Sequence, residues 1–171
     1  MNAAIWFGAA LFFTFGVAPT FFTEEMKALL GGSTRAEAYA GLIAQMVLKR
    51  FFVLNYWCGA LALAHLLAEW VYLGKSIHRW TLGILLGAFI MALAGGLWLQ
   101  PKLRELHLIR YAEQGPYTAV EKLQAAKSFS FWHGLSQVMN LAVMGGLGVY
   151  VWRITHSSDA PRFVSASKFR S

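Results

Sequence analysis

The sequence predicts an all-α integral membrane protein, a four-helix bundle with amphipathic helical extensions in its first and third loops. Of its 171 residues, 57% are hydrophobic and only 13% are charged, whereas an average soluble domain is about 25% charged. The apolar residues also gather in four runs, each close to the ~20 residues that cross a bilayer as a helix. The total of 171 residues leaves no room for a separate soluble catalytic module.

The four apolar runs are the predicted membrane spans. They cover residues 3–22, 51–73, 80–100 and 129–152. No Lys or Arg precedes the first run and no small-residue cleavage site follows it, so we expect a retained helix rather than a signal peptide. Because proline lacks a backbone N–H, Pro19 is expected to end or kink the first span and Pro101 to stop the third.

The loops between the spans differ in length. Residues 74–79 form a short turn, so spans two and three are predicted to be an antiparallel hairpin. Residues 23–50 and 101–128 are longer and carry helical patterns, and the helix of the first loop can run directly into span two. A membrane domain over residues 1–153 is therefore expected, followed by a basic, Ser-rich tail at 154–171.

The formal net charge of +7 does not indicate nucleic-acid binding. The Lys and Arg residues lie in loops and at the ends of apolar runs, where membrane proteins place them for anchoring and orientation. Nine of them fall in loops one and three and six on the opposite side, so the positive-inside rule favours loops one and three in the cytoplasm. Cys58 is the single cysteine, which excludes an intrachain disulfide and a metal site built from cysteines.

Span two carries three polar residues, Asn55, His65 and Glu69. His65 and Glu69 are four residues apart and share one face of the helix. They form either a pair that neutralises itself near the membrane interface or two ligands of a metal site. In the second case His133 is the natural candidate for the third ligand.

Span four opens with a stripe of polar residues. His133, Gln137 and Asn140 stand at i, i+4 and i+7 on one helical face, with Ser136 beside them. The stripe either makes hydrogen bonds between helices or lines a site for a ligand, a proton or a metal. We expect it to face the bundle interior, toward the His65 and Glu69 side of span two.

Other features concern cofactors and partners. A non-covalent b-type haem needs one or two histidines inside the bundle, which His65 and His133 could supply. The loop histidines His78 and His107 are expected to be solvated. Small residues recur every fourth position in span three, for example Gly83 and Gly87, and they favour either packing within the bundle or a homo-oligomer face.

Three patterns together resemble a known family. They are FFTFGVAPTFF in the first span, LWLQPKL at the end of the third and FSFWHGLSQVMNLAVMGGLG at the start of the fourth. They are similar to the four-span proteins named after transmembrane protein 205, whose bacterial members carry the domain of unknown function numbered 4149. The family's Trp-Leu-x-Pro motif corresponds to Trp98, Leu99 and Pro101, and its His-Gly-x-Ser-x-x-x-Asn motif to His133, Gly134, Ser136 and Asn140. Gln100 stands where some members carry an acidic residue.

The resemblance implies a four-helix membrane bundle and a multi-pass protein of a bacterial inner membrane. It implies little about activity, so three hypotheses remain. The first is a membrane protein that binds a ligand, lipid or metal, or serves as an accessory subunit of a larger complex. The second is an oxidoreductase linked to haem or a quinone. The third is a protein of metal-ion transport or resistance.

Overall fold

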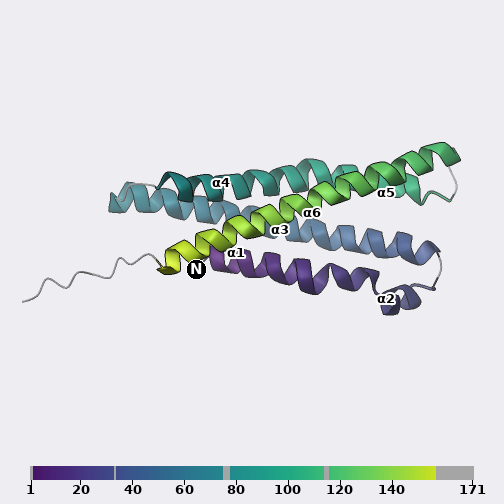
Figure 1. Ribbon diagram of the computed structural model, residues 1–171, viewed down its shortest axis with the longest axis horizontal. Helices are drawn as coiled ribbons and strands as arrows, with labels where there is room; N and C mark the ends of the chain where they lie inside the picture. The colour runs from purple at the N-terminus through teal and green to yellow at the C-terminus, as the bar shows by residue number, and fades with distance from the viewer. Residues whose placement is uncertain (1, 33, 75–77, 114–115, 157–171) are drawn as a thin grey trace, which may run out of the picture.

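The computed structural model describes residues 2–32, 34–74, 78–113 and 116–156. These residues form helices and turns and contain no strand. Four of the helical stretches are long and apolar enough to cross a membrane: Asn2–Phe22, Arg35–Tyr72, Arg79–Arg110 and Ala119–His156. They lie side by side in one elongated bundle (Figure 1). The predicted all-α, four-span class is therefore confirmed.

The first span changes its helix type twice. It begins as α1 (Asn2–Leu11), widens into the π-helical turn η1 (Phe12–Val17) and narrows into the 3-10 turn η2 (Pro19–Phe22). In the wide turn the Ala18 N–H donates to the Phe13 carbonyl, five residues back, at 2.8 Å. The change to the narrower turn comes at Pro19, which cannot donate to a preceding carbonyl.

A short helix and a long one follow. α2 (Glu24–Leu29) is capped by Thr23, whose hydroxyl accepts a hydrogen bond from the Met26 N–H at 3.3 Å. α3 (Thr34–Leu73) is one helix of 40 residues, which joins the helical part of the first loop to span two. At 1.5 Å per residue it is about 60 Å long, roughly twice the hydrocarbon thickness of a bilayer. Part of α3 therefore stands outside the hydrocarbon.

The third helix does not end at Pro101, so the prediction that the proline stops it is wrong, and the boundary of the membrane span itself stays a prediction. α4 (Arg79–Ala94), the π-helical turn η3 (Gly95–Leu99) and α5 (Gln100–Arg110) follow one another on a single helical path. The Gln100 N–H bonds back to the Gly95 carbonyl, and this wide turn places Pro101 in the first turn of α5. At that position a helix needs no donor from the residue, so the proline is accommodated.

The last helix, α6 (Ala119–His156), has 38 residues and contains the predicted fourth span. It packs against α4 and α5 along much of its length and against α1 near its C-terminal half. Its end includes residues 154–156 of the predicted tail, and residues 157–171 lie outside the described part of the chain.

All four spans contribute to one buried cluster. Trp6, Leu85 and Leu147 are fully buried there. The other buried members come from α3, α4 and α6: Cys58, Ala62, Ala88 and Val143. Because the members pack against one another, the cluster also shows which parts of the four spans lie near one another.

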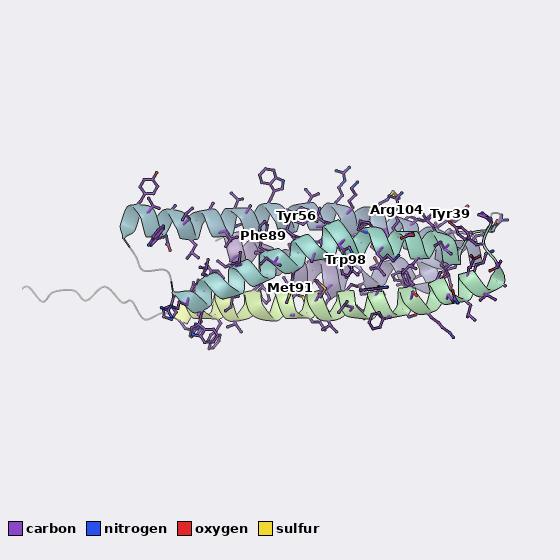
Figure 2. All side chains as sticks on the ribbon, turned by 90° about the horizontal axis from the view of Figure 1, so that it is seen from above. Tyr39, Tyr56, Phe89, Met91, Trp98 and Arg104 are labelled. Atoms are coloured by element: carbon purple, nitrogen blue, oxygen red, sulfur yellow. The ribbon has the colours of Figure 1, made fainter. Side chains whose placement is uncertain are left out.

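The outer surface of the bundle is apolar. Phe12 is 70% exposed, Trp57 66% and Val138 64%, and many other large apolar side chains point outward in Figure 2. In water such a surface would be a large aggregation-prone patch, whereas in a bilayer it faces lipid tails. This arrangement is that of a membrane protein.

The small residues of the third span divide between two roles. Ala88 and Ala92 are buried inside the bundle. Gly83 and Gly87 have no atom within 4 Å of the place where a Cβ would stand. Packing within the bundle thus accounts for one line of small residues, and a role of the other line in a homo-oligomer stays a prediction.

Candidate functional site

His65 and Glu69 lie close together on the outside of α3. His65 Nε2 stands 3.7 Å from Glu69 Oε1, and the two side chains are 74% and 37% exposed. Both lie in the part of α3 beyond Ala62, toward its C-terminal end. The sequence therefore predicted their pairing, and the structure places the pair at the surface of the bundle.

His133 does not approach this pair. One buried cluster contains Cys58 and Ala62 of α3 together with Val143 and Leu147 of α6, and the two helices run in the same direction (Figure 1). His65 lies three residues beyond the cluster on α3 and His133 ten residues before it on α6, so the two histidines are roughly 20 Å or more apart along the bundle. Within the described residues no three His, Cys, Asp or Glu side chains are grouped to hold a metal ion.

The polar stripe of α6 does not face His65 and Glu69, so that prediction is wrong. Asn140 Nδ2 donates to Thr14 Oγ1 of η1 at 2.8 Å. Gln137 Nε2 lies 3.2 Å from His133 Nε2, and both of these side chains are exposed. The reason is the arrangement of the helices, since α6 packs on α1, α4 and α5 and Asn140 meets η1 through its hydrogen bond.

The remaining residues of the motif have local roles. Ser136 Oγ donates to the His133 carbonyl within the same helix at 2.7 Å. Gly134 faces open space. Trp98 is 57% exposed and meets Trp132 edge to face, with ring centroids 5.2 Å apart, which joins η3 to α6.

Asn55 is a buried polar residue that joins the first two spans by a hydrogen bond. It is 4% exposed, and its Oδ1 accepts a hydrogen bond from Trp6 Nε1 at 2.5 Å. Its Nδ2 donates to the Phe51 carbonyl at 2.7 Å. Nearby, Asn2 Nδ2 donates to the Cys58 carbonyl at 2.7 Å. Since the Asn55 amide already has partners on both atoms, the geometry gives it a structural role.

His107 is the candidate that sequence reasoning missed, and the prediction that it is solvated is wrong. Only 5% of it is exposed, and its Nε2 lies 3.0 Å from the Ala38 carbonyl. The ring fills the space in front of Gly41, where a Cβ would collide with it. A signal was present in the sequence, because Leu103, Leu106 and His107 follow the i, i+3, i+4 spacing of a buried helix face.

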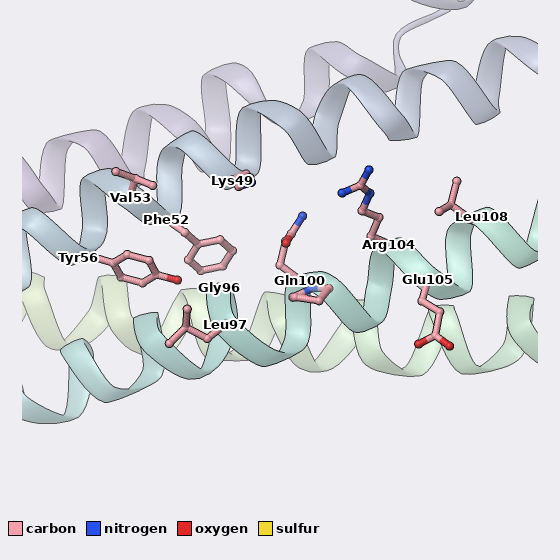
Figure 3. Close-up of a pocket in the computed structure, with 11 residues that line it drawn as sticks. Lys49, Phe52, Val53, Tyr56, Gly96, Leu97, Gln100, Arg104, Glu105 and Leu108 are labelled. Carbon is pink, nitrogen blue, oxygen red and sulfur yellow. The ribbon is translucent and has the colours of Figure 1, made fainter.

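A cleft of 520 Å³ opens between α3 and the η3–α5 segment. Figure 3 shows the lining residues arranged along two facing helices. α3 contributes Lys49, Phe52, Val53 and Tyr56, and the facing segment contributes Gly96, Leu97, Gln100, Pro101, Arg104, Glu105 and Leu108. Sequence reasoning did not predict this site, because it forms only where two distant segments meet.

The shape of the cleft follows from the sequence of both walls. The α3 residues recur at i, i+3, i+4 and i+7 and so share one face. On the other wall a Cβ at Gly96 would collide with the Tyr56 hydroxyl, and one at Gly95 would stand 2.8 Å from the Phe52 ring. The two glycines thus allow the π-helical turn to approach α3 closely, and the cleft begins beside this contact.

One end of the cleft is apolar and the other is cationic. Phe52, Val53 and Leu97 form the apolar part, and the polar end holds the cations Lys49 and Arg104 together with Glu105, with Leu108 beyond them (Figure 3). Arg104 points toward α3 whereas Glu105 points away from it (Figure 3), and Glu105 pairs with Lys102 at 3.2 Å. Among the described residues no carboxylate forms an ion pair with Lys49 or Arg104.

Beyond the cleft, the end of the bundle is held by polar contacts between α3 and the end of α5. Arg35 forms a two-point ion pair with Glu113, at 2.6 and 2.9 Å. The Tyr111 hydroxyl donates to Glu37 at 3.2 Å, and burial raises the pKa of this phenol above its ordinary value. These contacts join the start of α3 to the residues that follow α5.

Comparison with known proteins identifies the family. Residues 1–112 match the family described as a domain of unknown function, DUF4149. The chain belongs to the DUF4149 family. No curated protein and no solved structure matches the chain. The DUF4149 segment contains Trp98, Pro101 and every residue that lines the cleft, and it ends before the motif at His133.

Proposed function

We propose that this DUF4149 protein is an integral membrane protein that binds an amphiphilic molecule. Part of that molecule would lie in the cleft between α3 and the η3–α5 segment. The observation that carries the proposal is the division of the cleft into an apolar end and a cationic end. An amphiphile has the same division, so its apolar part and its polar head can each meet a matching surface.

The position of the cleft along the bundle supports the proposal. On α3 the charged residues end at Arg50 and do not resume until Glu69. On the facing path no charge occurs between Arg79 and Lys102. The cleft spans both boundaries, so its apolar end adjoins the lipid-facing part of the bundle and its cationic end adjoins the polar part. A molecule that lies in the bilayer reaches such a site without leaving the membrane.

The size of the cleft is also suitable. Small-molecule sites usually enclose about 300 to 1,000 Å³, and the cleft has 520 Å³. This volume takes a head group with the first part of a chain, and the rest of the chain would extend along exposed Val53 and Leu97 into lipid.

The other two hypotheses have less support. A haem held by both His65 and His133 needs the two rings close together, whereas they lie roughly 20 Å or more apart along the helices. Transport or resistance based on His65, Glu69 and His133 needs a metal site that these residues do not assemble within the described chain. A quinone remains compatible with the cleft, because the Tyr56 hydroxyl and the Gln100 amide can donate hydrogen bonds to a carbonyl.

The cellular setting belongs to the same proposal. The resemblance to the transmembrane protein 205 family supports a bacterial inner membrane, and the distribution of Lys and Arg supports loops one and three in the cytoplasm. The cleft then opens toward the cytoplasmic leaflet. An accessory role in a homo-oligomer or a larger complex is compatible with the exposed apolar surface of α4 and α6.

Blocking the apolar end of the cleft tests the proposed function. In Val53→Trp the indole would occupy the space beside Phe52 and Leu97, so the full-length protein should lose most of its co-purifying amphiphile. The control is Val149→Trp, because Val149 is 51% exposed and lies on α6 away from the cleft. Native mass spectrometry of the detergent-purified proteins measures the bound molecule, and an absorption spectrum reports a quinone.

Equal amounts of bound amphiphile in wild type, Val53→Trp and Val149→Trp would overturn the proposal. A wild-type protein that carries no amphiphile and binds none when lipid is added would also overturn it.

A further inference from the structure

The polar end of the cleft brings together two cations from different helices. Lys49 comes from α3 and Arg104 from α5, and they are 55 residues apart in the chain. Arg104 is directed toward α3, on which Lys49 lies (Figure 3). An anion that enters this part of the cleft would be attracted by both charges.

The neighbouring carboxylate does not supply that anion. Glu105 pairs with Lys102, one turn back on the outer side of α5, at 3.2 Å, and it points away from α3 (Figure 3). Gln100 also lines the cleft, and its amide can donate one more hydrogen bond. The polar end therefore carries two cations and an amide donor, and its lining carboxylate, Glu105, is paired with Lys102 rather than with either cation.

We propose that the cleft selects an anionic phospholipid, whose phosphate binds between Lys49 and Arg104 while one acyl chain lies against Val53, Tyr56 and Leu97. This inference rests on the proposed function and names its ligand. A guanidinium binds phosphate with two parallel hydrogen bonds, and an ammonium adds a compact charge. The phosphate of an anionic lipid can thus accept hydrogen bonds from both side chains at once.

The apolar wall decides between a lipid and a free phosphate. Phe52 and Val53 continue directly from Lys49 along α3, and Leu97 continues from Gln100 on the opposite wall. A free phosphate ion makes no use of this surface, whereas a lipid covers it with its chain and gains the burial of apolar area. The anionic lipids of a cytoplasmic leaflet also meet the cationic end at the depth of their head groups.

The test compares lipid binding by the full-length protein with and without the two cations. Purified protein in neutral detergent is titrated with phosphatidylglycerol and, separately, with phosphatidylcholine, and native mass spectrometry gives the bound fraction. The variant Lys49→Gln/Arg104→Gln removes both charges and keeps the side-chain lengths similar. The matched control, Arg50→Gln/Lys127→Gln, removes two exposed cations that do not line the cleft.

Wild type should bind phosphatidylglycerol more tightly than phosphatidylcholine. In Lys49→Gln/Arg104→Gln that preference should fall roughly tenfold or more, because each cation near an anionic lipid contributes about a factor of five. The control pair should change the preference by roughly twofold or less, since its charges stand outside the cleft. The charge-keeping pair Lys49→Arg/Arg104→Lys should retain most of the preference.

Three results would overturn the inference. The first is an equal loss of preference in the cleft variant and in the control variant. The second is an unchanged preference in Lys49→Gln/Arg104→Gln. The third is displacement of the lipid by millimolar inorganic phosphate, which would mean that the site binds the free ion.

The Val53→Trp variant separates the choice of an anionic lipid from the binding of an amphiphile in general. If Val53→Trp abolishes the binding of both lipids while Lys49→Gln/Arg104→Gln keeps the preference, the cleft holds an amphiphile but does not select an anion. If Val53→Trp binds both lipids like wild type, the cleft is not the binding site and both proposals fall.

Discussion

At the scale of single residues, several polar side chains in the spans hold helices together. Two hydrogen bonds join α1 to α3, from Trp6 to Asn55 and from Asn2 to the Cys58 carbonyl. A third joins α6 to η1, from Asn140 to Thr14. In a bilayer such bonds replace water as the partner of polar atoms. The sequence reveals which residues are polar and which share a helical face, but it does not reveal which neighbour that face meets.

The histidines show the limits of residue-level prediction. The spacing of His65 and Glu69 correctly indicated a neighbouring pair, because both residues belong to one helix. The proposed meeting of His133 with that pair depended on how α3 and α6 are aligned, which local spacing does not contain. His107 was misjudged because it lies in a charged segment, although its position beside Leu103 and Leu106 places it on the buried face.

The contact between Gly41 and His107 can be tested by substitution. The His107 ring occupies the space in front of it, so Gly41→Ala should lower the stability of the detergent-solubilised protein by about 1–3 kcal/mol through overpacking. Gly87→Ala is the control, because Gly87 faces open space and alanine is the better helix former. Thermal unfolding should therefore show a lower midpoint for Gly41→Ala and an equal or higher one for Gly87→Ala.

A second variant links the effect to the histidine. His107→Ala opens the space in front of Gly41, so adding Gly41→Ala to it should cause much less further loss than it causes alone. Equal losses in both backgrounds would contradict the packing of His107 on Gly41.

At the scale of helical elements, the number and approximate extent of the spans follow from the sequence. A spanning segment must satisfy its backbone hydrogen bonds internally, so a long apolar run in a membrane becomes a helix. The path through Pro101 was not predictable in this way. It depends on the wide turn at Gly95–Leu99, and that turn depends on the contact of its glycines with Phe52 and Tyr56 of a distant helix.

The bond between Asn140 and Thr14 gives a prediction at the element scale, because it joins α6 to η1 across 126 residues of sequence. In a double-mutant cycle with Thr14→Val and Asn140→Leu, the two changes should be coupled by about 0.6 kcal/mol, the average for such bonds between membrane helices. A parallel cycle with Thr14→Val and Gln137→Leu should be additive, since Gln137 bonds to His133 instead. Unfolding free energies in mixed micelles measure both cycles.

Additive effects of Thr14→Val and Asn140→Leu would contradict the packing of α6 on η1. Coupling between Thr14 and Gln137 of similar size would indicate a different rotation of α6.

At the scale of the whole molecule, the sequence determined the class because an apolar composition and four long runs permit few alternatives to a membrane bundle. The binding cleft was not foreseen. Its walls come from α3 and from the η3–α5 segment, and each wall separately reads as an ordinary span end with basic residues. The site exists only through the close approach of the two segments at Gly96.

Photo-cross-linking in intact membranes shows directly whether the cleft holds a membrane amphiphile. A benzophenone amino acid replaces Leu97 in the cleft and, in a separate control protein, Val138 of α6, because both positions are more than 60% exposed but only Leu97 lines the cleft. After illumination, mass spectrometry of the intact protein measures lipid adducts. We expect the adducts at position 97 to be dominated by one anionic lipid class, while those at position 138 follow the bulk lipid composition. Adducts of the same composition at both positions would contradict the proposal.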